Sequence, residues 1–229
     1  MEQTVLTKAE MARLRSLMSL ADPEQLAMIE QMLGPDMPRL PKYPQYANDP
    51  VGYARDVLKV EWWEAQCRIA EALLKPPYRV LVPSGHSTGK THISGGIINW
   101  FYDTHDPCTI ITTAPTARDV RDLMWKEVRM QRKDRGDLMP VMPEMSDADD
   151  HLAKGFTAKL SESFRGRHDK PMLFIFDEAT GVPSVFWENT KTMWKSEPGY
   201  AWICFYNPTD TASRAYVEDH SEGWTVIRM

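Results

Sequence analysis

The fold of this chain is decided by the stretch Leu81-Val82-Pro83-Ser84-Gly85-His86-Ser87-Thr88-Gly89-Lys90-Thr91. An apolar run ends at Pro83, a loop of small residues follows, and a helical pattern begins after Lys90. The apolar positions of that pattern have helical spacing: Ile93, Ile97, Ile98 and Phe101. A strand, a small-residue loop and a helix that opens on Gly-Lys-Thr form the context of a nucleotide-binding P-loop.

Each part of this loop suits phosphate binding. The glycines let successive backbone N–H groups point at one phosphate, and the new helix adds its positive N-terminal end. We expect Lys90 to reach the β- and γ-phosphates of ATP and the Thr91 hydroxyl to ligate Mg²⁺. The strict motif begins with glycine, where this chain has Ser84, and a chance Gly-Lys-Thr in a loop is the alternative. The predicted nucleotide contacts are Ser84, Gly85, His86, Ser87, Thr88, Gly89, Lys90 and Thr91.

Length and composition indicate one α/β domain with an appendage. The 229 residues are 42% hydrophobic and 26% charged, which allows an ordinary core. No apolar run is long enough to span a bilayer, and the first residues lack the pattern of a signal peptide. Cys67, Cys108 and Cys204 have no metal-ligand spacing, which predicts reduced, buried thiols of an intracellular protein. The net charge of −5 restricts any DNA contact to a local basic patch.

Residues 1–47 are predicted to form a helical hairpin and a linker, and residues 48–229 the P-loop domain. Thr7 and Glu10 have the spacing of a capping box, and a second helix is expected after Asp22-Pro23. Prolines at three-residue intervals then predict an extended linker: Pro35, Pro38, Pro41 and Pro44. We interpret the hairpin as an appendage or as a docking piece for a partner.

A glutamine, Gln66, lies shortly before the P-loop strand, where it could contact a nucleotide base. Helix resumes at Asp49-Pro50, and the pattern continues to Gln66. A glutamine amide both donates and accepts hydrogen bonds, as recognition of an adenine edge requires. The residues by themselves are equally compatible with an ordinary surface glutamine.

A strand at residues 108–113 is followed by a helix with one basic end. The apolar face of this helix is Val120, Leu123, Met124 and Val128, and its basic residues are Lys126, Arg129, Arg132, Lys133 and Arg135. An exposed, solvated helix end explains such a cluster, and contact with DNA phosphate or with a neighbouring subunit's nucleotide is the alternative. Residues 137–154 are acidic and aperiodic, which predicts a loop.

Two acidic residues follow a continuous apolar run, Met172 to Phe176, which is typical of a strand buried on both faces. Asp177 at the tip of such a strand faces a P-loop and can hold Mg²⁺. Glu178 can orient and deprotonate the attacking water. Two surface acids after a strand are the alternative, which the Gly-Lys-Thr upstream disfavours.

A further apolar strand at residues 201–206 ends in Asn207-Pro208. We expect this strand to lie between the P-loop strand and the strand before Asp177. An amide at its tip would sit near the γ-phosphate and sense its presence. Residues 224–227 are expected to begin a last strand.

These segments, in this order, resemble the ATPase domain of the large terminase subunit, the motor that packages DNA into the capsids of tailed phages and herpesviruses. The similarity covers roughly residues 66–210. The Thr-Ala-Pro-Thr turn and the Asn-Pro are more specific than the Walker motifs, which many NTPase families share. The matching segments are Gln66 (adenine motif), Ser84 to Thr91 (Walker A), Thr112 to Thr116, the helix from Val120 to Arg129, Gly166-Arg167-His168, Phe176 to Ala179 (Walker B) and Tyr206-Asn207-Pro208 (coupling motif).

The resemblance implies a P-loop NTPase fold of the RecA-like, additional-strand catalytic-glutamate class, with a mostly parallel sheet flanked by helices. It also implies that Gln66 binds adenine, Lys90 and Thr91 hold phosphate and Mg²⁺, Asp177 supports the metal, Glu178 is the catalytic base and Asn207 couples hydrolysis to motion. The implied partners are double-stranded DNA, the portal of a procapsid, the small terminase subunit and further copies of the chain in a ring. The implied location is the host cytoplasm, without a membrane. Terminases also carry a C-terminal nuclease domain, for which this sequence leaves no room, so nuclease activity is not expected.

Two other classes remain open. A helicase needs a second RecA-like domain, and only 19 residues follow Asp210. A nucleotide-responsive assembly subunit would bind ATP and hardly hydrolyse it. A small-molecule kinase is less favoured because it does not need Glu178 directly after Asp177.

The P-loop contains no arginine, although phosphoryl transfer normally uses a further positive charge at the γ-phosphate. We therefore expect a neighbouring subunit to supply one. Arg129 and Arg132 are favoured over Arg165 and Arg167, because a helix end projects farther than the entry to a strand.

Overall fold

The computed structural model describes residues 40–132, 142–148, 150–157 and 171–229, together with Leu14, Met18, residues 21–22, 24–25 and 28–29, and Gln31. The capping box expected at Thr7, most of the proline-rich linker and the arginines at 165 and 167 lie outside these residues. The predicted start of the second helix is confirmed by a reciprocal cap. The Gln25 N–H donates to Asp22 Oδ1 (2.8 Å), and the Asp22 N–H donates to Gln25 Oε1 (3.1 Å).

The described residues form one seven-stranded sheet in the order β3-β4-β2-β5-β6-β1-β7. Neighbouring strands are parallel except for β3 and β4, which are antiparallel. Strand β6 lies between β1 and β5, which confirms the predicted position of the strand before Asn207. The strands are β1 (Arg79–Pro83), β2 (Thr109–Thr113), β3 (Glu144–Ala148), β4 (His151–Phe156), β5 (Met172–Phe176), β6 (Tyr200–Tyr206) and β7 (Thr225–Val226).

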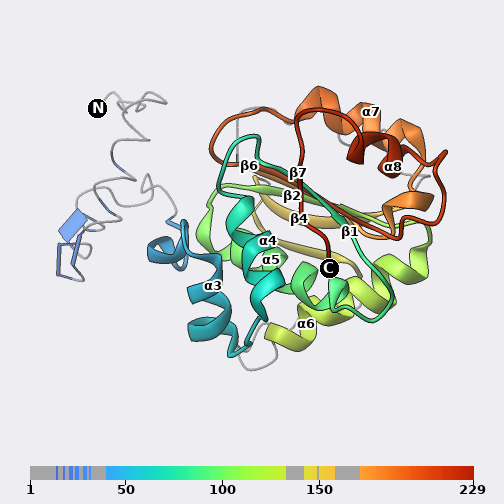
Figure 1. The fold of residues 1–229 in the computed structure, drawn as a ribbon. Coiled ribbons are helices and arrows are strands. Elements are labelled where there is room, and N and C mark those ends of the chain that lie inside the picture. Colours follow the sequence, from blue (N-terminus) through green and yellow to red (C-terminus); the bar gives the residue numbers. More distant parts are fainter. Residues whose placement is uncertain are drawn as a thin grey trace.

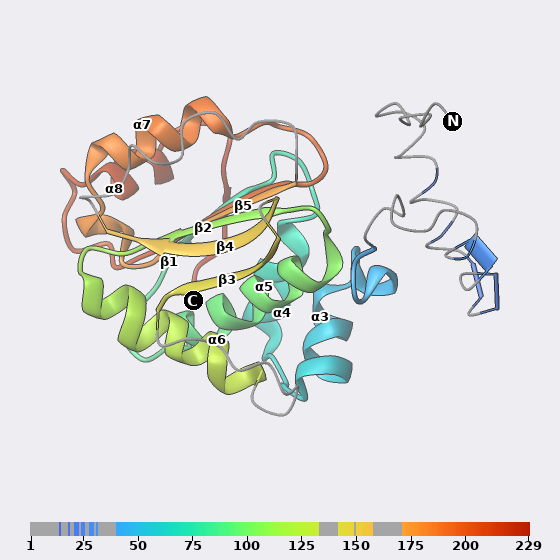
Figure 2. The ribbon, with the colours of Figure 1, turned by 180° about the vertical axis from the view of Figure 1, so that it is seen from behind.

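Helices cover both faces of the sheet. Figures 1 and 2 show α3, α4, α5 and α6 on one face and α7 and α8 on the other. In the part of the chain that the structure describes, no helix combines the length and hydropathy needed to cross a bilayer. The helices and helical turns are η2 (Pro44–Tyr46), α3 (Pro50–Tyr53), η3 (Ala54–Leu58), α4 (Glu64–Ala72), α5 (Lys90–Thr104), η4 (Asp119–Met124), α6 (Trp125–Arg132), η7 (Ala179–Gly181), α7 (Ser184–Met193) and α8 (Arg214–Asp219).

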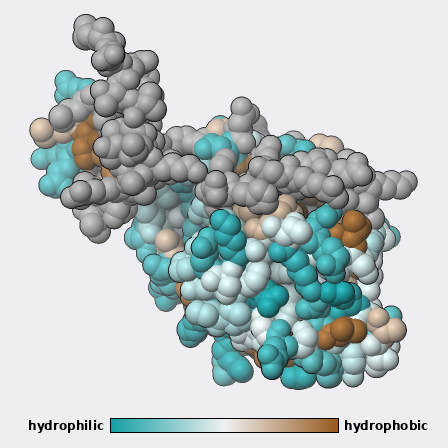
Figure 3. Space-filling model, turned by 90° about the horizontal axis from the view of Figure 1, so that it is seen from above, coloured by the Kyte–Doolittle hydropathy of each residue, from teal (hydrophilic) through white to brown (hydrophobic). Residues whose placement is uncertain are grey.

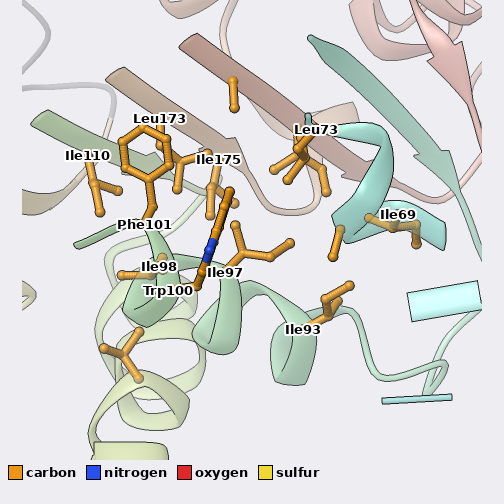
Figure 4. Packing of buried hydrophobic residues seen from close by; sticks show 14 of the residues in the cluster. Ile69, Leu73, Ile93, Ile97, Ile98, Trp100, Phe101, Ile110, Leu173 and Ile175 are labelled. Atoms are coloured by element: carbon orange, nitrogen blue, oxygen red, sulfur yellow. The ribbon is translucent and has the colours of Figure 1, made fainter. Parts of the chain in front are cut away.

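Side chains of the central strands alternate between two hydrophobic clusters. Leu173 and Ile175 of β5 pack with α5 residues such as Ile97, and Figure 4 shows these side chains meeting between the helix and the sheet. Phe174 and Phe176 point to the opposite face. Because both faces are covered, the buried strands read as continuous apolar runs. The predicted α/β fold with a mostly parallel sheet is confirmed.

The prediction of a loop over residues 137–154 is wrong. Strand β3 and strand β4 lie in this range, and β4 pairs with the full length of β2. The buried positions of β4 include small residues, so the hydrophobicity of this segment did not predict a strand. A Cβ at Gly155 would come within 2.4 Å of Val120 Cγ1, so glycine is needed for this close packing.

The helix after Thr116 begins with a π-helical turn, η4, before the regular α6. The wider turn changes the register, so Leu123 is 48% exposed although its spacing predicted a core position. Trp125 is buried instead, and its indole N–H donates to Thr112 Oγ1 (2.9 Å).

The end of the expected extended linker is a helical turn, η2, which packs on α5. The Trp100 indole N–H of α5 donates to the Tyr46 carbonyl oxygen (2.8 Å).

Among the described residues, the exposed large hydrophobic side chains belong to several different elements. The face seen from above in Figure 3 is largely hydrophilic, with hydrophobic residues in separate small patches. All three cysteines are free thiols, and Cys108 and Cys204 are buried as predicted. Cys67 is partly exposed, so the prediction of burial is wrong for that residue.

Candidate nucleotide-binding site

The carboxyl ends of β1, β5 and β6 meet at one edge of the sheet. In the strand register, Pro83 pairs with Tyr206, and Phe176 pairs with Cys204. Ser84 therefore leaves the sheet level with Asn207, and Asp177 leaves it from the neighbouring strand β5, two residues earlier in the register. Such an edge, at the carboxyl ends of parallel strands, is where α/β proteins bind ligands.

The loop between β1 and α5 has the curled backbone that phosphate binding requires. Ser87 and Gly89 are left-handed, with φ of 59° and 86°. Ser84 does not have a positive φ, which explains why a residue with a Cβ is accepted at this position. Its side chain is buried (4% exposed), and its N–H donates to the Tyr206 carbonyl oxygen (3.0 Å).

Lys90, the first residue of α5, connects the P-loop to both neighbouring strands. Its ammonium donates to Asn207 Oδ1 (2.8 Å) and lies 3.0 Å from Glu178 Oε1. Lys90 is 7% exposed, so its ammonium is largely shielded from water. The Asn207 amide nitrogen is also 3.4 Å from His86 Nε2. Three predicted site residues thus meet at one ammonium group, and His86 lies next to them.

Glu178 has an unusual backbone conformation for its residue type. Its φ of 46° and ψ of 48° are left-handed, which costs energy in any residue with a Cβ. This conformation accompanies the contact of the carboxylate with Lys90, and the side chain remains 39% exposed. A strained, half-exposed carboxylate beside the P-loop lysine is a typical feature of a functional site.

Asp177, the residue before Glu178, is 4% exposed. Burial, together with the charge of Glu178, raises the pKa of Asp177 to about 6, although the Lys90 ammonium opposes both effects. Its Oδ1 accepts a hydrogen bond from the Glu178 N–H (3.0 Å). A buried carboxylate with little compensation is suited to a cation ligand.

The structure adds one contact that the sequence pattern did not indicate. Thr180 Oγ1 of η7 donates to the Asn207 carbonyl oxygen (3.0 Å). The segment after Glu178 is thereby tied to the tip of β6. No motif in the sequence marks Thr180, because the contact joins residues that are distant in the chain.

Gln66 lies against the P-loop rather than on an open surface. It is 3% exposed, and its Nε2 donates to the Gly89 carbonyl oxygen (3.2 Å). Its Oε1 accepts from the Trp63 N–H (3.3 Å), so the amide joins the start of α4 to the end of the loop. Each polar atom of the Gln66 amide thus already has one protein partner.

The two favoured arginines do not occupy comparable positions. Arg132 does not project from the helix end: it is 5% exposed, and its Nη1 donates to Asp103 Oδ1 (3.1 Å) and Asn99 Oδ1 (3.3 Å). The expectation that Arg132 is exposed at the end of α6 is therefore wrong. Arg129 is partly buried, its Nη2 donates to the Arg121 carbonyl oxygen (3.3 Å), and burial lowers its pKa. Neither arginine contacts Lys90, Glu178 or Asn207.

No group of three or more His, Cys, Asp or Glu side chains able to hold a metal occurs within the described residues. A nucleotide-bound Mg²⁺ does not need such a group, because phosphate oxygens and water supply most of its ligands. Asp177 and Thr91, a buried carboxylate and a hydroxyl in the first turn of α5, are ligand types that fit this ion.

No protein-family model matches the chain, and no curated protein matches its sequence. Its fold is similar to the large terminase of a thermophilic bacteriophage, with a TM-score of 0.58 and 15% identity over 74% of this chain and 46% of that one. An ADP complex of that terminase has a TM-score of 0.54 and 15% identity over 73% and 45%. A variant of the ATPase domain of the Thermus phage P74-26 large terminase has a TM-score of 0.56 and 12% identity over 79% and 86%.

The chain therefore has the fold of a RecA-like P-loop ATPase domain. Within that class, it has the fold of phage large-terminase ATPase domains, which confirms at the level of the fold the resemblance that its motifs indicate. It spans less than half the length of the first of these terminases.

Proposed function

We propose that this chain is the ATP-hydrolysing motor domain of a viral large terminase subunit, which drives double-stranded DNA into a procapsid. The observation that carries the proposal is the meeting of Glu178 and Asn207 at the Lys90 ammonium, on the fold of a terminase ATPase domain. In the proposal, Ser84 to Thr91 bind the phosphates of ATP, and Gln66 binds the adenine.

Lys90 and Glu178 have to change partners during a turnover. The Glu178 carboxylate now neutralises the ammonium that would bind the β- and γ-phosphates. When phosphate takes its place, Glu178 is free to accept a proton from water. The water oxygen attacks the γ-phosphorus, the bond from that phosphorus to the bridging oxygen breaks, and ADP leaves.

Asp177 and Thr91 would hold Mg²⁺, which supplies positive charge to the β- and γ-phosphates when bound. Asn207 Oδ1 accepts a hydrogen bond from the Lys90 ammonium, so the Asn207 amide would respond when Lys90 changes partner. The Asn207 carbonyl oxygen accepts a hydrogen bond from Thr180 Oγ1. A movement of Asn207 on loss of the γ-phosphate would therefore shift the segment after Glu178. In this way Asn207 would couple hydrolysis to motion.

Arg129 remains our candidate for the arginine that acts in a neighbouring subunit's site. Within the described residues, no arginine contacts Lys90, Glu178 or Asn207, and we propose that the further positive charge comes from another chain. Arg129 lies on the α6 helix and is less buried than Arg132. The proposed assembly is a homo-oligomeric ring in the host cytoplasm at the procapsid portal, with the small terminase subunit and a nuclease domain as further components.

The test is hydrolysis of ATP by the chain, with and without double-stranded DNA and in the presence of Mg²⁺. Glu178→Gln should retain ATP binding and lose turnover by about two orders of magnitude or more, the usual contribution of a general base. Lys90→Ala should weaken nucleotide binding itself. Glu197→Gln removes a carboxylate that is 53% exposed and is the matched control.

Stimulation of hydrolysis by double-stranded DNA supports the motor. ATP binding without significant hydrolysis in either condition would instead support an assembly subunit that responds to nucleotide. A Glu178→Gln variant with the wild-type rate would refute the assignment of the base.

A further inference from the structure

Two consecutive tryptophans precede α4, and the fold treats them differently. Trp62 is 8% exposed and packs on α5, where a Cβ at Gly96 would come within 2.4 Å of its Cζ2. Trp63 is 51% exposed. The chain thus buries one indole as an anchor and holds the next at the surface.

The exposed tryptophan is attached to the P-loop through Gln66. The Trp63 N–H donates to Gln66 Oε1, and Gln66 Nε2 donates to the Gly89 carbonyl oxygen. The packing at Gly89 is close, because a Cβ there would lie 2.8 Å from Gln66 Nε2. The backbone of Trp63 is therefore linked, through the Gln66 amide, to the last residue of the loop before Lys90.

We propose that Trp63 stacks on the base of the bound nucleotide. This inference rests on the proposed function, because it assumes that the loop binds the phosphates of a nucleoside triphosphate. In this inference the base lies beside Gly89, at the end of the loop, where the exposed indole of Trp63 covers one face of it. Stacking requires only a π-face, so Trp63 would strengthen binding of every purine nucleotide.

Trp63 and Gln66 would have separate roles at the base. The Gln66 amide reads the hydrogen-bonding edge and distinguishes adenine from guanine. The Trp63 indole contributes affinity without that distinction. Removing Trp63 should therefore weaken ATP and GTP by similar factors, whereas removing Gln66 should change the ratio of the two.

The test compares binding of ATP, GTP and inorganic triphosphate to the 229-residue chain by isothermal titration calorimetry with Mg²⁺. Trp63→Ala should weaken ATP and GTP by about five- to a hundredfold, the effect of losing one aromatic–base stack. Binding of inorganic triphosphate should not change, because it has no base. Trp63→Phe keeps an aromatic face and should recover most of the affinity.

Met130→Ala is the matched control, because Met130 is 52% exposed and lies on a different helix. ATP affinity that is unchanged in Trp63→Ala would overturn the stacking and leave the proposed function intact. Equal weakening of ATP and inorganic triphosphate would also overturn it, because the side chain would then act on the loop. A wild-type chain that binds neither compound would refute the proposed function, and the stacking with it.

Discussion

Replacing Asp177 by asparagine should make the protein more stable in the absence of nucleotide. Asp177 is buried, and burial raises its pKa to about 6 from the usual 3.8. Above this pKa the buried carboxylate is ionised in the folded protein, and its charge lowers the free energy of unfolding. The Lys90 ammonium compensates for little of this charge, because it also contacts Glu178 and Asn207. Asparagine has a similar shape, can still accept the hydrogen bond from the Glu178 N–H, and carries no charge.

The size and the pH dependence of the effect follow from the pKa. The raised pKa means that the unfolded chain releases its proton first as the pH rises, so the wild type loses stability between about pH 4 and pH 6. The difference between a pKa of about 6 and the usual 3.8 corresponds to about 3 kcal/mol. The gain in Asp177→Asn should therefore be about 3 kcal/mol at pH 8 and about half of that at pH 5.

Urea unfolding without nucleotide at pH 8 and pH 5 measures the gain. Asp122→Asn is the control, because Asp122 is 44% exposed and its pKa is lowered by Arg121, so its removal should not stabilise the protein. The same Asp177→Asn variant should show less stabilisation by Mg²⁺ and ATP than the wild type. An unchanged or lower free energy of unfolding at pH 8 would refute the argument that this carboxylate is held at a cost.

Three further outcomes are expected. Asn207→Ala should leave ATP affinity nearly intact and uncouple hydrolysis from DNA movement, and normal packaging by that variant in a full-length terminase would contradict this role. Hydrolysis per chain should rise with protein concentration, and a mixture of Arg129→Ala and Glu178→Gln chains should recover turnover that neither variant shows alone. A rate per chain that does not change with concentration, together with no recovery on mixing, would mean that Arg129 does not act between subunits. Arg132→Ala should lower the free energy of unfolding by about 3 kcal/mol or more, because it leaves the Asp103 carboxylate buried without this partner. A free energy of unfolding equal to that of Arg129→Ala would show that the buried pair contributes little to stability.

The sequence by itself determined the parts of the site that depend on local order. The turn from β1 into α5 requires small residues, Gly89 in a left-handed conformation and a helix that begins at Lys90, and these features are contiguous in the chain. The continuous apolar run before Asp177 indicates a strand buried on both faces. Both segments could be predicted because their structure depends on neighbouring residues.

The tertiary structure decided which distant residues meet and which side chains are exposed. Lys90 bonds to Asn207 across 117 positions, and only the order of the strands brings them together. Strand β4 was missed because its membership in the sheet depends on pairing with β2, not on a hydrophobic period of its own. The sequence predicted that Arg132 is exposed at a helix end, but its side chain is buried in an ion pair with Asp103 of α5. Pairings of this kind depend on packing between elements, which the local pattern of residues does not record.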